Sequence, residues 1–155
     1  MPIIRLETFI QAPCQQVFDL ARSVDAHTAS MENRKEQAVA GKTSGLLALH
    51  DCVTWRAKHL GIWQHLTSCI TQYESPHYFR DSMQQGAFHR FDHDHFFEAH
   101  KGGTRMRDVF DYTTPFGMVG RFADGLFLEQ YMRRLLMQRN QVLKHLAEAP
   151  EGVRW

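Results

Sequence analysis

Residues 53–70 read VTWRAKHLGIWQHLTSCI, and they fix the register of the sheet on which the fold is built. Apolar and polar residues alternate on both sides of Leu60-Gly61, as in two strands that each bury one face. A tight turn at Leu60-Gly61 joins the strands as an antiparallel hairpin and places Trp55 opposite Leu66. The inward face of this hairpin then carries Val53, Trp55, Ala57, His59, Ile62, Gln64, Leu66, Ser68 and Ile70.

Further turn signals repeat the hairpin pattern along the chain. They lie at residues 74–76, 84–86 and 101–103, and they divide residues 51–115 into five consecutive strands. Residues 3–10 have the alternation of a first strand, and residues 37–40 are suited to a short second strand. The sequence therefore predicts a seven-stranded antiparallel sheet.

A pair of helices is predicted between the first two strands. Pro13 suits the first position of a helix, and Val17, Phe18 and Leu20 follow at helical spacing. Asp25 is the predicted cap of a short second helix.

A long helix is predicted near the C-terminus, up to residue 147. Arg139 falls near the apolar stripe of this helix, and two outcomes stay open. Either the aliphatic part of its side chain extends outward and places the guanidinium in solvent, or the guanidinium pairs with an acidic residue. The helix should end before Pro150. The stripe contains Leu128, Met132, Leu135, Val142 and Leu146, with Leu136 and Leu143 beside it.

Length and charge limit the classes of protein. The 155 residues predict one domain, residues 1–149, and a loose tail at residues 150–155. With 18 basic and 17 acidic residues, the net charge is +1. We therefore expect no broad positive electrostatic field that would bind a nucleic acid.

The sequence also predicts a location for the protein. The first residues lack a signal-peptide pattern, and no apolar run is long enough to span a bilayer. Cys14, Cys52 and Cys69 are odd in number and widely spaced, which indicates reduced thiols. We therefore expect a cytoplasmic protein without a membrane-spanning segment.

This order of strands and helices resembles the START-like superfamily, also called SRPBCC. The most telling segments are residues 38–45 (AVAGKTSG), 53–61 (VTWRAKHLG) and 103–117, and they are similar to a bacterial branch. The resemblance implies an α+β helix-grip fold, in which a curved sheet wraps around a long C-terminal helix. It also implies a cavity for lipids, polyketides, hormones or quinones, as in the polyketide cyclase and coenzyme-Q-binding relatives.

The inward face of all five strands gives a predicted ligand site. It is mainly apolar and aromatic with a few polar groups, as in many small-molecule pockets. The predicted ligand-binding residues are Trp55, His59, Leu66, Asp81, Phe91, His93, His95, Phe97, Met106, Asp108, Phe110, Tyr112, Met118, Phe122 and Met132.

His95 and Asp108 form the polar corner of this predicted site. The turn at residues 101–103 places them opposite each other, and a buried carboxylate needs a partner. Three interpretations stay open: the two residues satisfy each other, they orient a ligand, or His95 is a general base oriented by Asp108.

Three functions follow from these interpretations. The first is binding of a small, largely apolar ligand, without a cofactor. The second is a cyclase or dehydratase that uses the His95 and Asp108 pair. The third is a protein-interaction module whose interior is filled by its own aromatic residues.

Other motifs are weaker. His93 and His95 form an HxH pair that could bind zinc or iron with His59 or Asp81, but no third ligand follows at a diagnostic spacing, so no metal is expected. Residues 41–43 (GKT) lack the first glycine of a P-loop, which excludes nucleotide binding there. Residues 117–120 (GMVG) are the predicted entrance to the cavity, with glycines as hinges.

Overall fold

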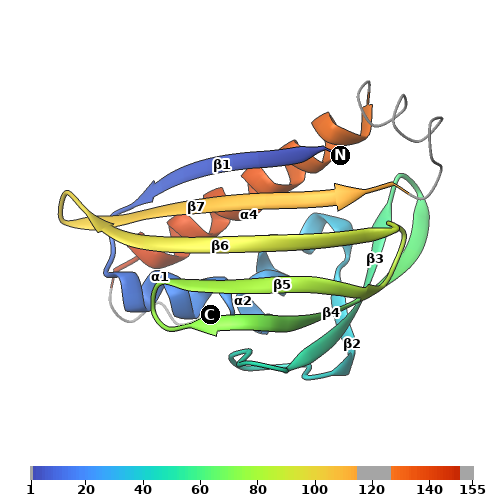
Figure 1. Ribbon diagram of the computed structural model, residues 1–155, viewed down its shortest axis with the longest axis horizontal. Coiled ribbons are helices and arrows are strands. Elements are labelled where there is room, and N and C mark those ends of the chain that lie inside the picture. Colours follow the sequence, from blue (N-terminus) through green and yellow to red (C-terminus); the bar gives the residue numbers. More distant parts are fainter. Residues whose placement is uncertain (1, 115–126, 151–155) are drawn as a thin grey trace.

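The computed structural model describes residues 2–114 and 127–150 (Figure 1). The predicted order of elements is confirmed, with a short 3-10 helix, η1 (Glu32–Arg34), added before the second strand. The strands are β1 (Ile3–Ile10), β2 (Gln37–Gly41), β3 (Cys52–His59), β4 (Ile62–Glu74), β5 (Tyr78–Gln85), β6 (Arg90–His100) and β7 (Gly103–Thr113). The helices are α1 (Cys14–Ala21), α2 (Val24–Ser30) and α4 (Glu129–Glu148).

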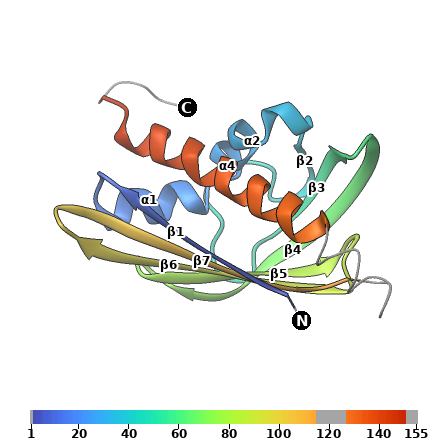
Figure 2. The ribbon, with the colours of Figure 1, turned by 90° about the horizontal axis from the view of Figure 1, so that it is seen from above.

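The described strands form one antiparallel sheet in the order β1-β7-β6-β5-β4-β3-β2. The sheet is curved, and Figure 2 shows α1, α2 and α4 all on one side of it. The predicted register is confirmed, because Trp55 lies opposite Leu66 and His95 lies opposite Asp108. The alternating burial along β3, β6 and β7 follows from this register.

The cap of α2 differs from the prediction. Ser23, in an extended conformation, precedes the helix, and its Oγ accepts a hydrogen bond from the Ala26 N–H at 3.1 Å. Ser23 is therefore the N-cap, and the assignment of this role to Asp25 was wrong. Asp25 lies in the first turn, and its carboxylate accepts a hydrogen bond from the Gly45 N–H at 3.0 Å.

The long helix α4 crosses the concave face of the sheet (Figures 1 and 2). Its buried face is rotated relative to the predicted stripe, because Val142 and Leu146 are half-buried and two polar residues face the sheet. None of the helices in residues 2–114 and 127–150, α4 included, is both long and apolar enough to span a bilayer. The buried residues of α4 are Leu135, Leu136, Arg139, Asn140, Leu143 and Ala147.

One end of the sheet is filled by a close-packed core under α1. The Phe18 ring of α1 makes edge-to-face contacts with Tyr73, Phe79 and Phe97, at centroid distances of 5.5, 5.6 and 5.4 Å. Such contacts stabilise a core beyond the area that they bury. Met106 is fully buried in the same cluster.

The β3–β4 turn contains an unusual leucine. Leu60 and Gly61 both have left-handed backbone dihedrals, with φ of 53° and 79°, and His59 pairs with Ile62 across the turn. This conformation favours glycine and asparagine, and it costs a residue such as leucine about 1–2 kcal/mol.

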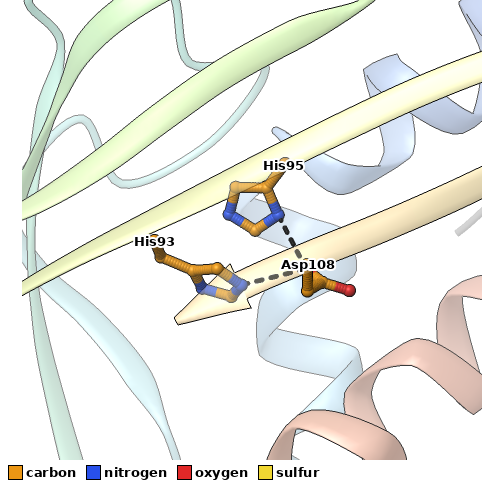
Figure 3. A group of neighbouring side chains, drawn as sticks. All are labelled: His93, His95 and Asp108. Atoms are coloured by element: carbon orange, nitrogen blue, oxygen red, sulfur yellow. Dashed lines mark hydrogen bonds and ion pairs between the residues drawn. The ribbon is translucent and has the colours of Figure 1, made fainter. Parts of the chain in front are cut away.

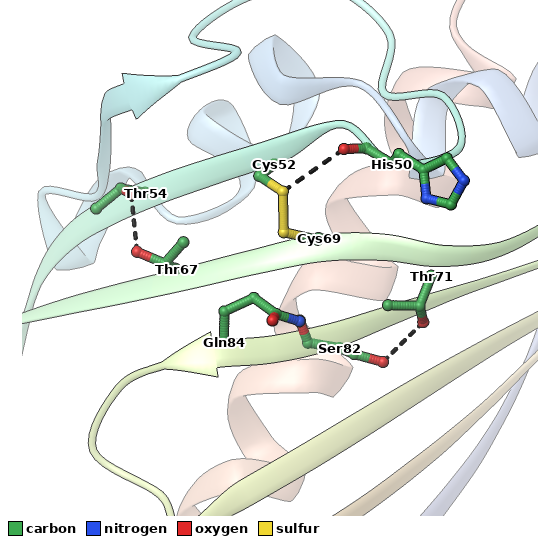
Figure 4. The surroundings of a disulfide bond; sticks show 8 residues. All are labelled: His50, Cys52, Thr54, Thr67, Cys69, Thr71, Ser82 and Gln84. Atoms are coloured by element: carbon green, nitrogen blue, oxygen red, sulfur yellow. Dashed lines mark hydrogen bonds between the residues drawn. A yellow bond between two sulfur atoms is a disulfide. The ribbon is translucent and has the colours of Figure 1, made fainter.

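A disulfide joins Cys52 of β3 to Cys69 of β4 on the face of the sheet away from the helices (Figure 4). The two residues lie directly opposite each other in the register, and their Cα atoms are 4.1 Å apart. The prediction of three reduced thiols was therefore wrong for this pair, and Cys14 is the free thiol. The inference of a reducing compartment rested on these cysteines and loses that support.

Candidate functional site

A cavity of about 430 Å³ lies between the concave face of the sheet and α4. Strands β3 to β7 form its floor and walls, and α2 and α4 cover it. Its size is within the range of small-molecule pockets, about 300–1,000 Å³. The apolar residues that line it include Trp55, Leu66, Ile70, Phe79, Phe88, Phe91, Phe110, Met132, Leu135 and Leu136.

Most of the residues predicted to bind a ligand border this cavity, and their contact with a ligand stays a prediction. Those in the lining are Trp55, His59, Leu66, Asp81, Phe91, His93, His95, Phe110 and Met132.

The remaining predicted residues lie elsewhere. Phe97 and Met106 are on the predicted face, but at the end of the sheet that the core under α1 fills. Asp108 and Tyr112 are fully buried and are not in the lining. Met118, Phe122 and the predicted entrance at residues 117–120 lie outside the described residues.

A polar group on the α2 side of the cavity was missed by sequence reasoning. His27 Nε2 lies 2.6 Å from Glu36 Oε1, and the His27 ring lies 4.3 Å from the Trp55 ring, centroid to centroid. Both residues of the pair line the cavity. No periodicity in the sequence marks them, because their position depends on how α2 folds back over the sheet.

A second polar group lies deeper, around Asp108 (Figure 3). His93 Nε2 donates a hydrogen bond to Asp108 Oδ1 at 2.9 Å, and His95 Nδ1 lies 3.1 Å from the same oxygen. The His95 ring is covered on both faces, by His93 at 3.8 Å and by Phe79 at 4.3 Å between ring centroids. This packing holds the His95 imidazole in one orientation.

Helix α4 supplies the other partners of Asp108. Asn140 Nδ2 donates a hydrogen bond to Asp108 Oδ2 at 2.7 Å. Arg139 Nη1 lies 3.7 Å from Asp108 Oδ1, and the guanidinium also donates hydrogen bonds to Asn140 Oδ1 and to the Ala21 carbonyl. Of the two predicted outcomes for Arg139, pairing with an acidic residue is therefore confirmed.

The protonation of this cluster follows from its burial and its contacts. Burial would raise the pKa of Asp108, but the contacts from His93 and His95 outweigh this effect and hold that pKa well below its ordinary value. Burial lowers the pKa of His95 well below its ordinary value, and the neighbouring His93 adds to the effect. At pH 7 the cluster therefore contains an ionised Asp108 and a neutral His95.

Asp81 is a second acidic residue in the cavity lining, besides Glu36. It lies opposite His93 in the β5–β6 register, and its Oδ1 has no hydrogen-bond partner among the described residues. Burial raises its pKa, and a hydrogen bond from Ser68 opposes the shift without reversing it. The protonated form of Asp81 is therefore favoured relative to an exposed aspartate.

The donor atoms of His93, His95 and Asp108 lie within 4.8 Å of one another, which resembles the ligand set of a metal site. The cation of Arg139, however, lies 3.7 Å from the same Asp108 oxygen that an ion would use. A divalent ion would meet this positive charge at close range, and Arg139 already balances the charge of Asp108. We therefore assign the cluster as a hydrogen-bonded charge pair.

The cavity reaches solvent between the β3–β4 turn and the start of α4. Leu60 and Phe127 both line it, yet their side chains are 57% and 56% exposed. Beside them, His59 Nδ1 lies 2.9 Å from the Tyr131 hydroxyl, which links β3 to α4. We call this opening the mouth of the cavity.

The protonation of His95 gives a prediction for stability. Below about pH 6.5 the unfolded chain takes up a proton on this histidine that the folded protein excludes, so the free energy of unfolding falls as the pH falls from 7 to 5. In His95→Gln, the slope of that free energy against pH should decrease by up to about 1.4 kcal/mol per pH unit. Urea unfolding at several pH values measures it.

His89→Gln, at an exposed histidine, is the matched control and should keep the parental slope. An unchanged slope in His95→Gln would contradict a neutral, buried imidazole.

Comparisons with known proteins agree with this architecture. A family model described as polyketide cyclase / dehydrase and lipid transport matches residues 10–137. Comparison with curated protein sequences gives no significant match.

Solved structures with the same fold come from bacteria and plants. TTHA0849 from Thermus thermophilus superposes with a TM-score of 0.77 at 18% identity, over 96% of this chain and 100% of that chain. A START superfamily protein from Mycobacterium smegmatis has a TM-score of 0.69 at 11% identity, over 94% and 97%. Major latex-like protein 151 of Panax ginseng has a TM-score of 0.68 at 10% identity, over 96% and 98%. At these identities the likeness establishes the helix-grip fold.

Proposed function

Since this chain belongs to the polyketide cyclase/dehydrase and lipid transport family, we propose that it binds a small, largely apolar molecule in the cavity under α4. The ligand class is lipid, quinone or polyketide-like. Binding of this kind requires no cofactor, because the walls and the polar groups of the protein supply the contacts.

The observation that carries the proposal is a cavity lined by large apolar side chains that do not fill it. The aromatic rings that meet in the core under α1 leave a space of about 430 Å³ toward the mouth. An apolar molecule that enters this space loses its contact with water, which contributes about 25 cal/mol per Å² of apolar surface. The interaction module with a filled interior is disfavoured for the same reason.

Asp81 is suited to bind the polar end of the ligand. It borders the cavity, and one of its oxygens has no hydrogen-bond partner among the described residues. A hydroxyl group can donate to a carboxyl oxygen and accept from a protonated one, so it matches either form of Asp81. We therefore infer that the ligand carries a hydroxyl or phenol group near Asp81 and His93.

Catalysis by His95 is the second candidate. In its favour, the imidazole is neutral and its Nδ1 lies 3.1 Å from Asp108 Oδ1, although the two atoms make no hydrogen bond. Against it, the side chain is only 3% exposed, and both ring faces are covered. The contacts favour a structural role that shapes the cavity, so binding is the first proposal. His95→Ala separates the two, because a binder loses affinity modestly and an enzyme loses turnover by orders of magnitude.

A side chain that occupies the cavity should abolish binding. Ala57 is buried on β3 and borders the cavity, so Ala57→Phe places a ring where the ligand would lie. We expect at least a tenfold loss of affinity for 1-naphthol by isothermal titration calorimetry. Ala99→Phe, at an exposed position of β6, makes the same substitution outside the cavity and should bind as the parent does. Parental affinity in a folded Ala57→Phe would show that the probe binds elsewhere.

The role of Asp81 is tested by a pair of probes that differ in one group. The parent should bind 1-naphthol several-fold more tightly than 1-methylnaphthalene, because a hydrogen bond contributes about 0.5–1.5 kcal/mol. In Asp81→Leu the two affinities should become equal. The variant should also unfold at a higher temperature at pH 8, since burial disfavours the ionised carboxyl that it removes. A hydroxyl preference that survives in Asp81→Leu would refute the assignment.

A further inference from the structure

The tip of the β3–β4 hairpin presents apolar side chains to solvent. Ile62 and Trp63 are 63% and 41% exposed, and they follow the exposed Leu60 directly across the turn. Large apolar residues gathered on one projecting turn commonly mark a contact surface. We call these three residues the hairpin tip.

The conformation of Leu60 is evidence that the tip is more than a turn. Leu60 has a φ of 53°, where asparagine or glycine fits without strain, and more than half of its side chain is in solvent. Folding therefore gains little from a leucine here. A strained residue that the fold does not require is a reason to look for a function.

Positive charge accompanies the tip. Arg56 Cζ lies 3.9 Å from the centroid of the Trp63 ring, and Lys58 Nζ lies 5.9 Å from it. Tryptophan flanked by lysine and arginine is typical of protein segments at the boundary between the headgroups and acyl chains of a bilayer. The charges complement anionic headgroups.

The tip also adjoins the mouth of the cavity. Leu60 belongs both to the tip and to the cavity lining, and Phe127 of the opposite rim is exposed as well. A surface that received the tip would therefore cover the mouth. An apolar ligand could then pass between that surface and the cavity without crossing water.

We propose that the hairpin tip docks on anionic phospholipid bilayers and brings the mouth of the cavity to the membrane surface. A specific protein partner would bury about 800 Å² on each side. A two-residue turn with its flanking positions is better suited to insertion among headgroups. This inference goes beyond ligand binding and can hold or fail separately from it.

The test is flotation of the full chain with vesicles of phosphatidylcholine and phosphatidylglycerol in a 3:1 ratio. The parent should float with these vesicles and more weakly with vesicles of pure phosphatidylcholine. Added salt should weaken its binding to the vesicles that contain phosphatidylglycerol. Leu60→Asn should reduce the partition coefficient at least tenfold. It should leave the melting temperature equal or higher, because asparagine suits the left-handed backbone.

Leu49→Asn makes the same substitution at another exposed leucine, which precedes β3 at its opposite end, and should float as the parent does. Arg56→Gln with Lys58→Gln should remove the preference for anionic vesicles. Three results would each overturn the proposal: no flotation of the parent, parental flotation of Leu60→Asn, or a parental dimer in light scattering that Leu60→Asn abolishes. Naphthol binding by the parent and by Leu49→Asn in the same samples reports separately on the cavity, because Leu60 itself lines it.

Discussion

The buried carboxylate of Asp108 is the constraint on which the rest of the site depends. A charge removed from water costs several kcal/mol unless its partners are in place, and the partners of Asp108 come from two different elements. His93 and His95 of β6 lie on one side, and Arg139 and Asn140 of α4 lie on the other. The fold therefore holds α4 at a fixed position over β6 and β7, and the shape of the neighbouring cavity follows from that position.

The space between the sheet and the helices has two regions, a packed core and a cavity. Where α1 packs on it, Phe18 and the rings around it fill the space. Toward the β3–β4 turn the strands extend beyond α1, and the cover there is α4 with the His59–Tyr131 contact near the mouth. The same inward face thus supplies a core at one end and a cavity at the other. This division is the physical basis for proposing ligand binding rather than a filled interaction module.

The register explains how much of this could be predicted from sequence. The Leu60-Gly61 turn determines which residues face inward, so the placement of Trp55, Asp81 and His95 follows from strand periodicity. The same register pairs Cys52 with Cys69. The disulfide was not predicted because the spacing of the cysteines along the chain does not show that these two lie opposite each other on neighbouring strands.

Other features depend on contacts between elements that are distant in sequence. Strand periodicity cannot tell that Phe97 and Met106 lie under α1, while Phe91 and Phe110 border the cavity. The buried face of α4 was displaced from the apolar stripe because Arg139 and Asn140 turn toward Asp108. A hydrophobicity pattern gives no weight to such residues, and their partner becomes known only when the helix is placed on the sheet.

Whether the cavity holds a small apolar molecule is tested most directly by native mass spectrometry of the purified protein. We expect a non-covalent adduct that is released into organic solvent, or that appears when the emptied protein is incubated with 1-naphthol. A bare chain both as purified and after incubation with saturating 1-naphthol would contradict this expectation.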